Sequence, residues 1–140
     1  MSTEPVPASR SRMERTTDTA LVLSGLRSMV GALSWAAPGT TWRTFGLGSM
    51  QRDPRAALVT RLFGARELAL GLAVQHPDKT VRRTALQAGV VIDAADITVS
   101  LVALKRGAPK AITLTFVAGA SLFVALGLTA LARDAEDTTD

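Results

Sequence analysis

The segment AITLTFVAGASLFVALGLTALA, residues Ala111 to Ala132, decides the fold of this chain. It holds 22 residues without a charged side chain, and Lys110 and Arg133 bracket it. As an α-helix it would be about 33 Å long, which is enough to cross a hydrocarbon core of about 30 Å. A soluble chain of 140 residues has little surrounding protein with which to bury so apolar a helix. The segment therefore predicts a transmembrane helix.

Three further apolar stretches precede this segment, and each contains charged residues. They run over about 19–37, 57–75 and 84–104. Helix-starting and helix-ending residues separate them: Asp53-Pro54 is typical of an N-cap and a first-turn proline, and Pro77-Asp78 ends one helix and caps the next. Gly107 and Pro109 end the third stretch. The pattern favours four helices joined by short connections.

We therefore predict an all-α fold, a four-transmembrane-helix up-down bundle with a polar, charge-balanced interior seam. The helices would cover about 18–37, 54–75, 79–106 and 110–133, within a single membrane domain of residues 17–133. Residues 1–16 would form a polar N-terminal tail and residues 134–140 an acidic C-terminal tail. The longest connection, 39–53, carries Trp42 and is expected to lie in the membrane interface, where tryptophan is common.

Six charged residues fall inside the apolar stretches, and their charges sum to zero. They are Arg27, Arg61, Arg66, Glu67, Asp93 and Asp96. Most fall at a similar depth in their helices, so a bundle would bring them within pairing distance near the membrane midplane. We expect Arg61 instead to reach toward the interface, because it follows the start of its helix closely.

Insertion energies explain why this pairing matters. A charge at the centre of a helix costs roughly 2.5–3.5 kcal/mol on insertion, whereas each Leu, Ile, Val or Phe returns about 0.3–0.6 kcal/mol. The apolar residues of stretch 84–104 therefore return about 4 kcal/mol against about 6 kcal/mol for Asp93 and Asp96. Such helices insert readily only in a bundle where the charges find partners.

Small and polar residues recur at three- and four-residue spacing through these helices, which predicts a packing seam where membrane helices approach closely. The seam residues are Ser24, Gly31, Gly64, Gly71, Gly89 and Ser100. Arg27, Glu67, Asp93 and Asp96 share this phase. The favoured interpretation is a structural ion network that fixes helix register. The alternative is a path for protons or a small polar solute.

Composition excludes several classes of protein. The chain has no cysteine and one histidine, which excludes disulfide scaffolds, zinc fingers, iron–sulfur sites and thiol nucleophiles. No catalytic or phosphate-binding motif occurs, so the sequence does not favour an enzyme and indicates neither a cofactor nor a metal. The net charge is +4, but the basic residues lie in clusters between apolar runs without interleaved aromatics. This distribution is typical of membrane-protein loops and disfavours nucleic-acid binding.

Two elements carry a resemblance to known proteins: RLFGARELALGL (Arg61 to Leu72) and VIDAADITVSLVAL (Val91 to Leu104). Together they resemble a family of uncharacterised small bacterial four-helix membrane proteins, domains of unknown function that are loosely similar to DoxX-like membrane proteins. The resemblance covers residues 19–132 and implies an integral bundle in the bacterial inner membrane. The resemblance implies no biochemical activity for this chain. A DoxX-like tie would suggest redox or quinone association, for which this chain offers no cysteine or membrane-embedded histidine.

The sequence as a whole predicts a small integral membrane protein with a structural or partner-binding role. Its expected partners are the lipid bilayer and either further copies of itself, in a homo-oligomer, or another membrane protein. The alternatives are a small transporter or proton-coupled carrier that uses the midplane charges, and a soluble helical bundle. The Lys and Arg residues divide nearly evenly between the two sides, so orientation is weakly specified. The arginines before the first helix favour cytoplasmic termini.

Overall fold

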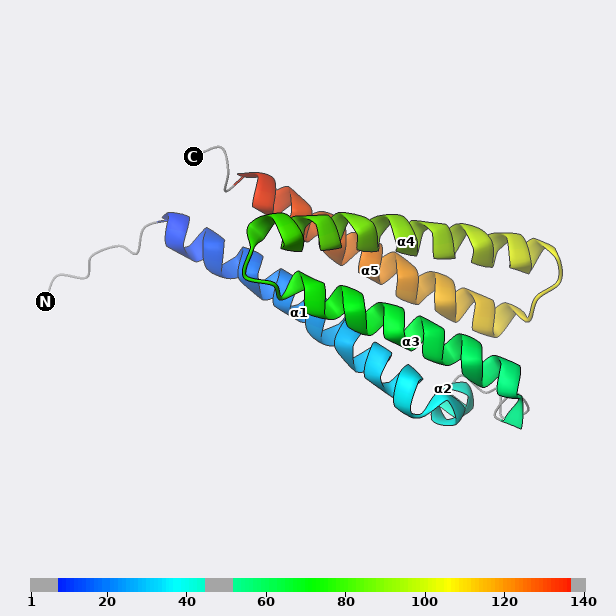
Figure 1. Ribbon diagram of the computed structural model, residues 1–140. Helices are drawn as coiled ribbons and strands as arrows, with labels where there is room; N and C mark the ends of the chain where they lie inside the picture. The colour runs from blue at the N-terminus through cyan, green and yellow to red at the C-terminus, as the bar shows by residue number, and fades with distance from the viewer. Residues whose placement is uncertain (1–7, 45–51, 137–140) are drawn as a thin grey trace, which may run out of the picture.

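The computed structural model describes residues 8–44 and 52–136, and the regular structure in these residues is entirely helical. The described residues form five helices (Figure 1), whose bounds are α1 Ala8–Ala36, α2 Pro38–Thr44, α3 Pro54–Val74, α4 Lys79–Lys105 and α5 Lys110–Glu136. The all-α prediction is confirmed for this part of the chain. Four long helices correspond to the four expected ones, and the short α2 was not expected.

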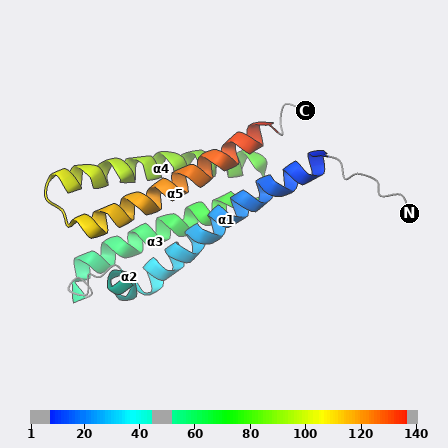
Figure 2. The same cartoon turned by 180° about the vertical axis from the view of Figure 1, so that it is seen from behind.

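The four long helices lie side by side and alternate in direction. α1 packs most extensively against α3, and α4 against α5, so the bundle consists of two antiparallel helix pairs. Contacts of α1 with α5 and of α3 with α4 join the two pairs. The start of α1, the α3–α4 connection and the end of α5 lie at one end of the bundle (Figures 1 and 2). α2 and the α4–α5 connection lie at the other end.

The helix boundaries follow the capping residues in the sequence. Asp53 caps α3, with its side chain accepting from the backbone N–H of Arg55 at 2.9 Å and Pro54 in the first turn. Asp78 caps α4 in the same way. Gly107 follows α4 with φ at +90°, a left-handed conformation that glycine adopts without strain. The connections are short because these stop and start signals follow one another closely.

Two boundaries differ from the sequence prediction. α1 begins at Ala8, not near residue 18, so residues 8–16 continue the helix where a polar tail was expected. Residues 8–18 include no proline or glycine, and the arginines and Glu14 among them are good helix formers, so nothing there stops the helix. α5 likewise continues to Glu136. The predicted 39–53 connection is partly helical, because α2 occupies its first residues and contains Trp42. Residues 45–51 of this connection lie outside the described residues.

The bundle hides polar groups and exposes apolar ones. Arg27, Glu67 and Asp93 are among its most buried side chains, at 1–2% exposure, whereas Val91 and Val99 are 69% and 68% exposed. Exposed large apolar residues occur on all four long helices. A soluble protein of this size would show the opposite arrangement. The exterior of the bundle is therefore suited to an apolar solvent.

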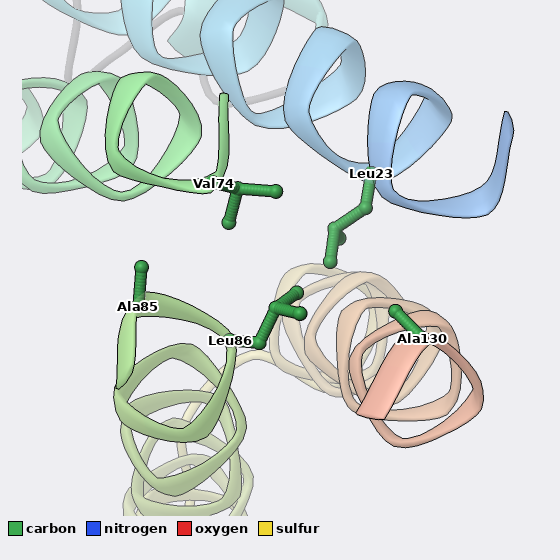
Figure 3. Close-up of a cluster of buried hydrophobic side chains, with 5 residues drawn as sticks. All are labelled: Leu23, Val74, Ala85, Leu86 and Ala130. Atoms are coloured by element: carbon green, nitrogen blue, oxygen red, sulfur yellow. The ribbon is translucent and has the colours of Figure 1, made fainter. Parts of the chain in front are cut away.

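The buried apolar cluster is small and lies toward the end of the bundle that holds the start of α1 and the end of α5. Its members come from all four long helices (Figure 3): Leu23, Val74, Ala85, Leu86 and Ala130. Polar contacts add to the cluster at this end. Arg133 donates to the Thr19 hydroxyl, and Arg82 Nη2 lies 3.7 Å from Asp134 Oδ1. These contacts join α5 to α1 and α4.

Three helices are long and apolar enough to cross a membrane: Thr19–Ala36 of α1, Lys79–Lys105 of α4 and Lys110–Ala135 of α5. α3 differs because it carries Arg55, Arg61, Arg66 and Glu67 within 21 residues. Its composition alone does not make it a membrane span. Whether α3 crosses therefore depends on how its charged groups are paired.

Candidate functional site

The centre of the candidate site is Arg27, which lies in α1 with 2% of its side chain exposed. Its Nη1 donates to Glu67 Oε2 of α3 at 2.6 Å. Its Nη2 forms an ion pair with Asp93 Oδ2 of α4, and both carboxylates are as deeply buried as the guanidinium. Charge-assisted hydrogen bonds of this kind are among the strongest in proteins. One arginine thus ties three helices together.

A second arginine extends the array toward the surface. Arg66 donates through Nη2 to Glu67 Oε1 at 2.9 Å and to Asp96 Oδ2 at 2.7 Å, and through Nη1 to Asp96 Oδ1 at 3.3 Å. The two Nη contacts to Asp96 form a bidentate pair, a geometry specific to arginine. Glu67 therefore bridges both arginines. We call Asp93, Arg27, Glu67, Arg66 and Asp96 the five-charge network.

Aromatic rings cover both guanidinium groups. The Cζ atom of Arg27 lies 4.6 Å from the centroid of the Phe123 ring on α5, and that of Arg66 lies 4.9 Å from the Phe63 ring. Both distances suit cation–π attraction. Phe123 brings α5 into the site, although α5 contributes no charge to it. The sequence reasoning missed both rings, although Phe63 lies three residues before Arg66, a spacing that places the two side chains on one face of α3.

Glycines provide the space that the site needs. A Cβ atom on Gly89 of α4 would come within 3.0 Å of Arg27 Nη2, so the absent side chain makes room for the guanidinium. Gly31 of α1 and Gly64 of α3 face each other so closely that a Cβ on either would lie 2.6–2.8 Å from backbone atoms of the other helix. Close approach of α1 and α3 lets the short Glu67 side chain reach Arg27.

Polar contacts continue along the α1–α3 interface beyond the network. The Ser24 hydroxyl donates to the Gly71 carbonyl oxygen at 3.0 Å, and Gln75 Nε2 donates to Ser24 Oγ at 2.6 Å. Ser24, Gly31, Gly64, Gly71 and Gly89, all predicted seam residues, are buried. Ser100, the sixth, is only partly buried on α4. The structure thus places five of the six predicted seam residues inside the bundle.

Arg61 lies outside the network. It is exposed, and its Nε donates to the Trp35 carbonyl oxygen at 3.4 Å, near the end of α1. Among the described residues, the network therefore joins three carboxylates to two guanidinium groups, which corrects the expectation of a charge-balanced seam. The zero sum in the sequence included Arg61, whose position early in α3 separates it from the other charges.

The chemistry open to this site is limited by its composition. Within the described residues, no group of three His, Asp or Glu side chains is arranged to hold a metal ion. The five-charge network can hold helices in register, and it contains one more carboxylate than guanidinium groups. Comparison with protein-family models, curated proteins and solved structures finds no match to this chain.

Proposed function

We propose that this protein is an integral membrane protein whose four long helices all cross the bilayer, and that the five-charge network serves to fix their register. The observation that carries this proposal is the inverted burial. Charged groups with partners occupy the interior, while valine and leucine side chains cover the exterior. Polar groups in membrane proteins characteristically face the bundle interior and pair with one another.

Pairing is also what lets α3 act as a fourth span. Glu67 is fully enclosed between Arg27 and Arg66, and Arg66 is held by Glu67 and Asp96, so neither charge faces lipid alone. Arg55 and Arg61 lie in the first turns of α3, from which long side chains can extend to the headgroup region. The role that follows is structural or partner-binding, in the cell membrane, with cytoplasmic termini.

Extraction of isolated membranes at alkaline pH tests this proposal. We expect the protein to remain with the membrane pellet, as integral proteins do, and to be released only by detergent. Release into the alkaline supernatant would show that the helices pack against a soluble partner or against one another, and would favour a soluble bundle.

One observation favours a second candidate, a proton-coupled carrier. The network holds three carboxylates and two guanidinium groups, so it has an excess negative charge, and its outer pair, Arg66 and Asp96, is partly exposed. A proton could therefore enter the array from one side. The test is pH-driven proton flux into liposomes that contain the purified protein. A carrier predicts flux that the substitution Asp96→Asn abolishes and Arg61→Gln preserves, whereas a structural network predicts no flux.

A further inference from the structure

The outer half of the five-charge network is incompletely covered. The Arg66 side chain is 30% exposed and the Asp96 side chain 39%, whereas Arg27, Glu67 and Asp93 are at most 2% exposed. Arg66 and Asp96 lie near the middle of α3 and α4, far from either end of the bundle. In a bilayer this depth is hydrocarbon, where lipid chains offer no hydrogen-bond partner. Something polar must cover this ion pair.

The surface next to the pair is suited to close helix packing. Arg66, Ala69 and Ala73 follow one another at three- and four-residue spacing, so they line one face of α3. Ala69 and Ala73 also line a shallow groove between α3 and α4, whose other wall includes Thr84 and Ala88. Leu70 and Val81 also line this groove, and its alanines would let another helix approach closely. We call this surface the α3/α4 face.

We propose that the α3/α4 face binds a second copy of this chain in the membrane. The proposal rests on the proposed membrane location of the bundle. Arg66 and Asp96 lie side by side on neighbouring antiparallel helices and carry opposite charges. A two-fold axis along the membrane normal keeps every residue at its own depth, so it sets Arg66 of each copy opposite Asp96 of the other.

This arrangement makes the face complementary to itself, which is the requirement of a two-fold symmetric interface. The two ion pairs would form a ring of alternating charge, closed to lipid. A face that carried only one sign of charge would repel its own copy. The combination of both signs at one depth with an alanine-rich groove therefore favours a homodimer over a partner of different charge pattern.

Cysteine cross-linking tests the dimer directly, because the chain has no cysteine of its own. Ala69 is exposed on the α3/α4 face, while Leu122 is 52% exposed on α5. With the full-length protein in its native membranes, oxidation of Ala69→Cys should give a product of twice the chain mass, and Leu122→Cys should not. Equal cross-linking at both positions, no product at Ala69→Cys, or a product of another mass would overturn the proposal.

A second pair of variants checks the interface without relying on cross-linking. Ala69→Phe fills the α3/α4 face, and Leu122→Phe makes a comparable change on α5. Light scattering in mild detergent should give a dimeric mass for the unsubstituted protein and for Leu122→Phe, and half that mass for Ala69→Phe. A monomeric mass for the unsubstituted protein would overturn the proposal.

The same membranes separate this inference from the proposed function. Protein that resists alkaline extraction yet fails to cross-link through Ala69→Cys would refute the dimer and leave the membrane location standing. Protein released at alkaline pH would refute the membrane location, and with it the reason for covering the Arg66–Asp96 pair.

Discussion

At the residue scale, Arg27 determines how the interior is organised. It is a buried cation that touches buried carboxylates from two other helices, so its removal would leave Glu67 with one partner and Asp93 without its guanidinium. A buried ion pair of this kind stabilises the fold about as much as well-packed apolar groups would. Removing one partner is nevertheless strongly destabilising, because the other charge then stays buried without a partner. This asymmetry gives Arg27 its importance.

The substitution Arg27→Ala should lower the free energy of unfolding by about 3–5 kcal/mol, because two buried carboxylates lose their common partner. Unfolding by denaturant in detergent micelles measures the change. Arg61→Ala is the matched control, since Arg61 is exposed and outside the network; it should change stability by less than about 0.5 kcal/mol. Equal effects of the two substitutions would contradict a central role for Arg27.

Exchange of charge tests whether the network is structural. Arg27→Asp and Asp93→Arg should each reduce the amount of folded protein, because each single variant brings like charges together. The double variant restores an opposite pair between α1 and α4 but leaves a carboxylate on α1 facing Glu67, so it should recover part of the folded protein on size-exclusion chromatography. A double variant no better than the worse single one would count against a register-fixing network.

At the element scale, the α1–α3 pair depends on glycine and the α4 helix depends on its cap. α1 and α3 approach so closely at Gly31 and Gly64 that a methyl group on either would meet backbone atoms of the other. Asp78 accepts hydrogen bonds from the backbone N–H groups of Thr80 at 2.7 Å and Val81 at 3.3 Å. Both features could be recognised in the sequence, because seams and caps follow local rules of spacing.

Gly64→Ala should therefore separate α1 from α3 and destabilise the bundle by about 1–3 kcal/mol, as overpacking does in close-packed interiors. Thermal unfolding in detergent is the measurement. Gly25 provides the control on α1, because a Cβ there meets nothing within 4 Å. Gly25→Ala should be neutral or slightly stabilising, since alanine has the higher helix propensity. Similar losses in both variants would mean that helix approach is not the cause.

Acid should weaken the start of α4. Hydrogen bonds from the backbone N–H groups of Thr80 and then Val81 hold the pKa of the Asp78 carboxyl below its ordinary value, and nearby His76 adds to this effect. Because the pKa is lower in the folded state, the stabilisation is present above the unfolded-state pKa and is lost as the pH falls through the folded-state pKa.

Asp78→Asn isolates this contribution, because asparagine caps a helix well and does not titrate. On acidification, the melting temperature of the unsubstituted protein should fall relative to that of Asp78→Asn. A difference between the two proteins that stays constant with pH would refute the assignment of this titration to Asp78.

At the scale of the whole molecule, the bundle is a set of apolar helices around a polar interior. Its apolar cluster holds few large side chains, so apolar burial alone contributes little to the bundle, and helix packing and paired charges supply the rest. The Ala111 to Ala132 segment contributes no charge, yet its helix covers Arg27 with Phe123. Each long helix thus contributes at least one side chain to the candidate site.

The sequence predicted the four long helices well, because hydropathy and caps such as Asp53 and Asp78 are local signals. It did not predict α2, whose seven residues begin with the helix-ending pair Pro38-Gly39. It did set Arg61 apart from the other charges, because Arg61 follows the start of its helix closely, but it could not say which of the remaining side chains meet. The contact of Arg27 with Phe123 and the excess of one carboxylate in the network emerge only when the helices are packed.

The central claim is that α3 crosses the membrane together with α1, α4 and α5. Labelling of single cysteines by a membrane-impermeant maleimide tests this claim most directly, since the chain has no native cysteine. Thr40→Cys in α2, before α3, and Arg106→Cys, after α4, should react from one side of the membrane, and His76→Cys, after α3, should react from the other. If Thr40→Cys and His76→Cys react from the same side, α3 does not cross and the four-span bundle is wrong.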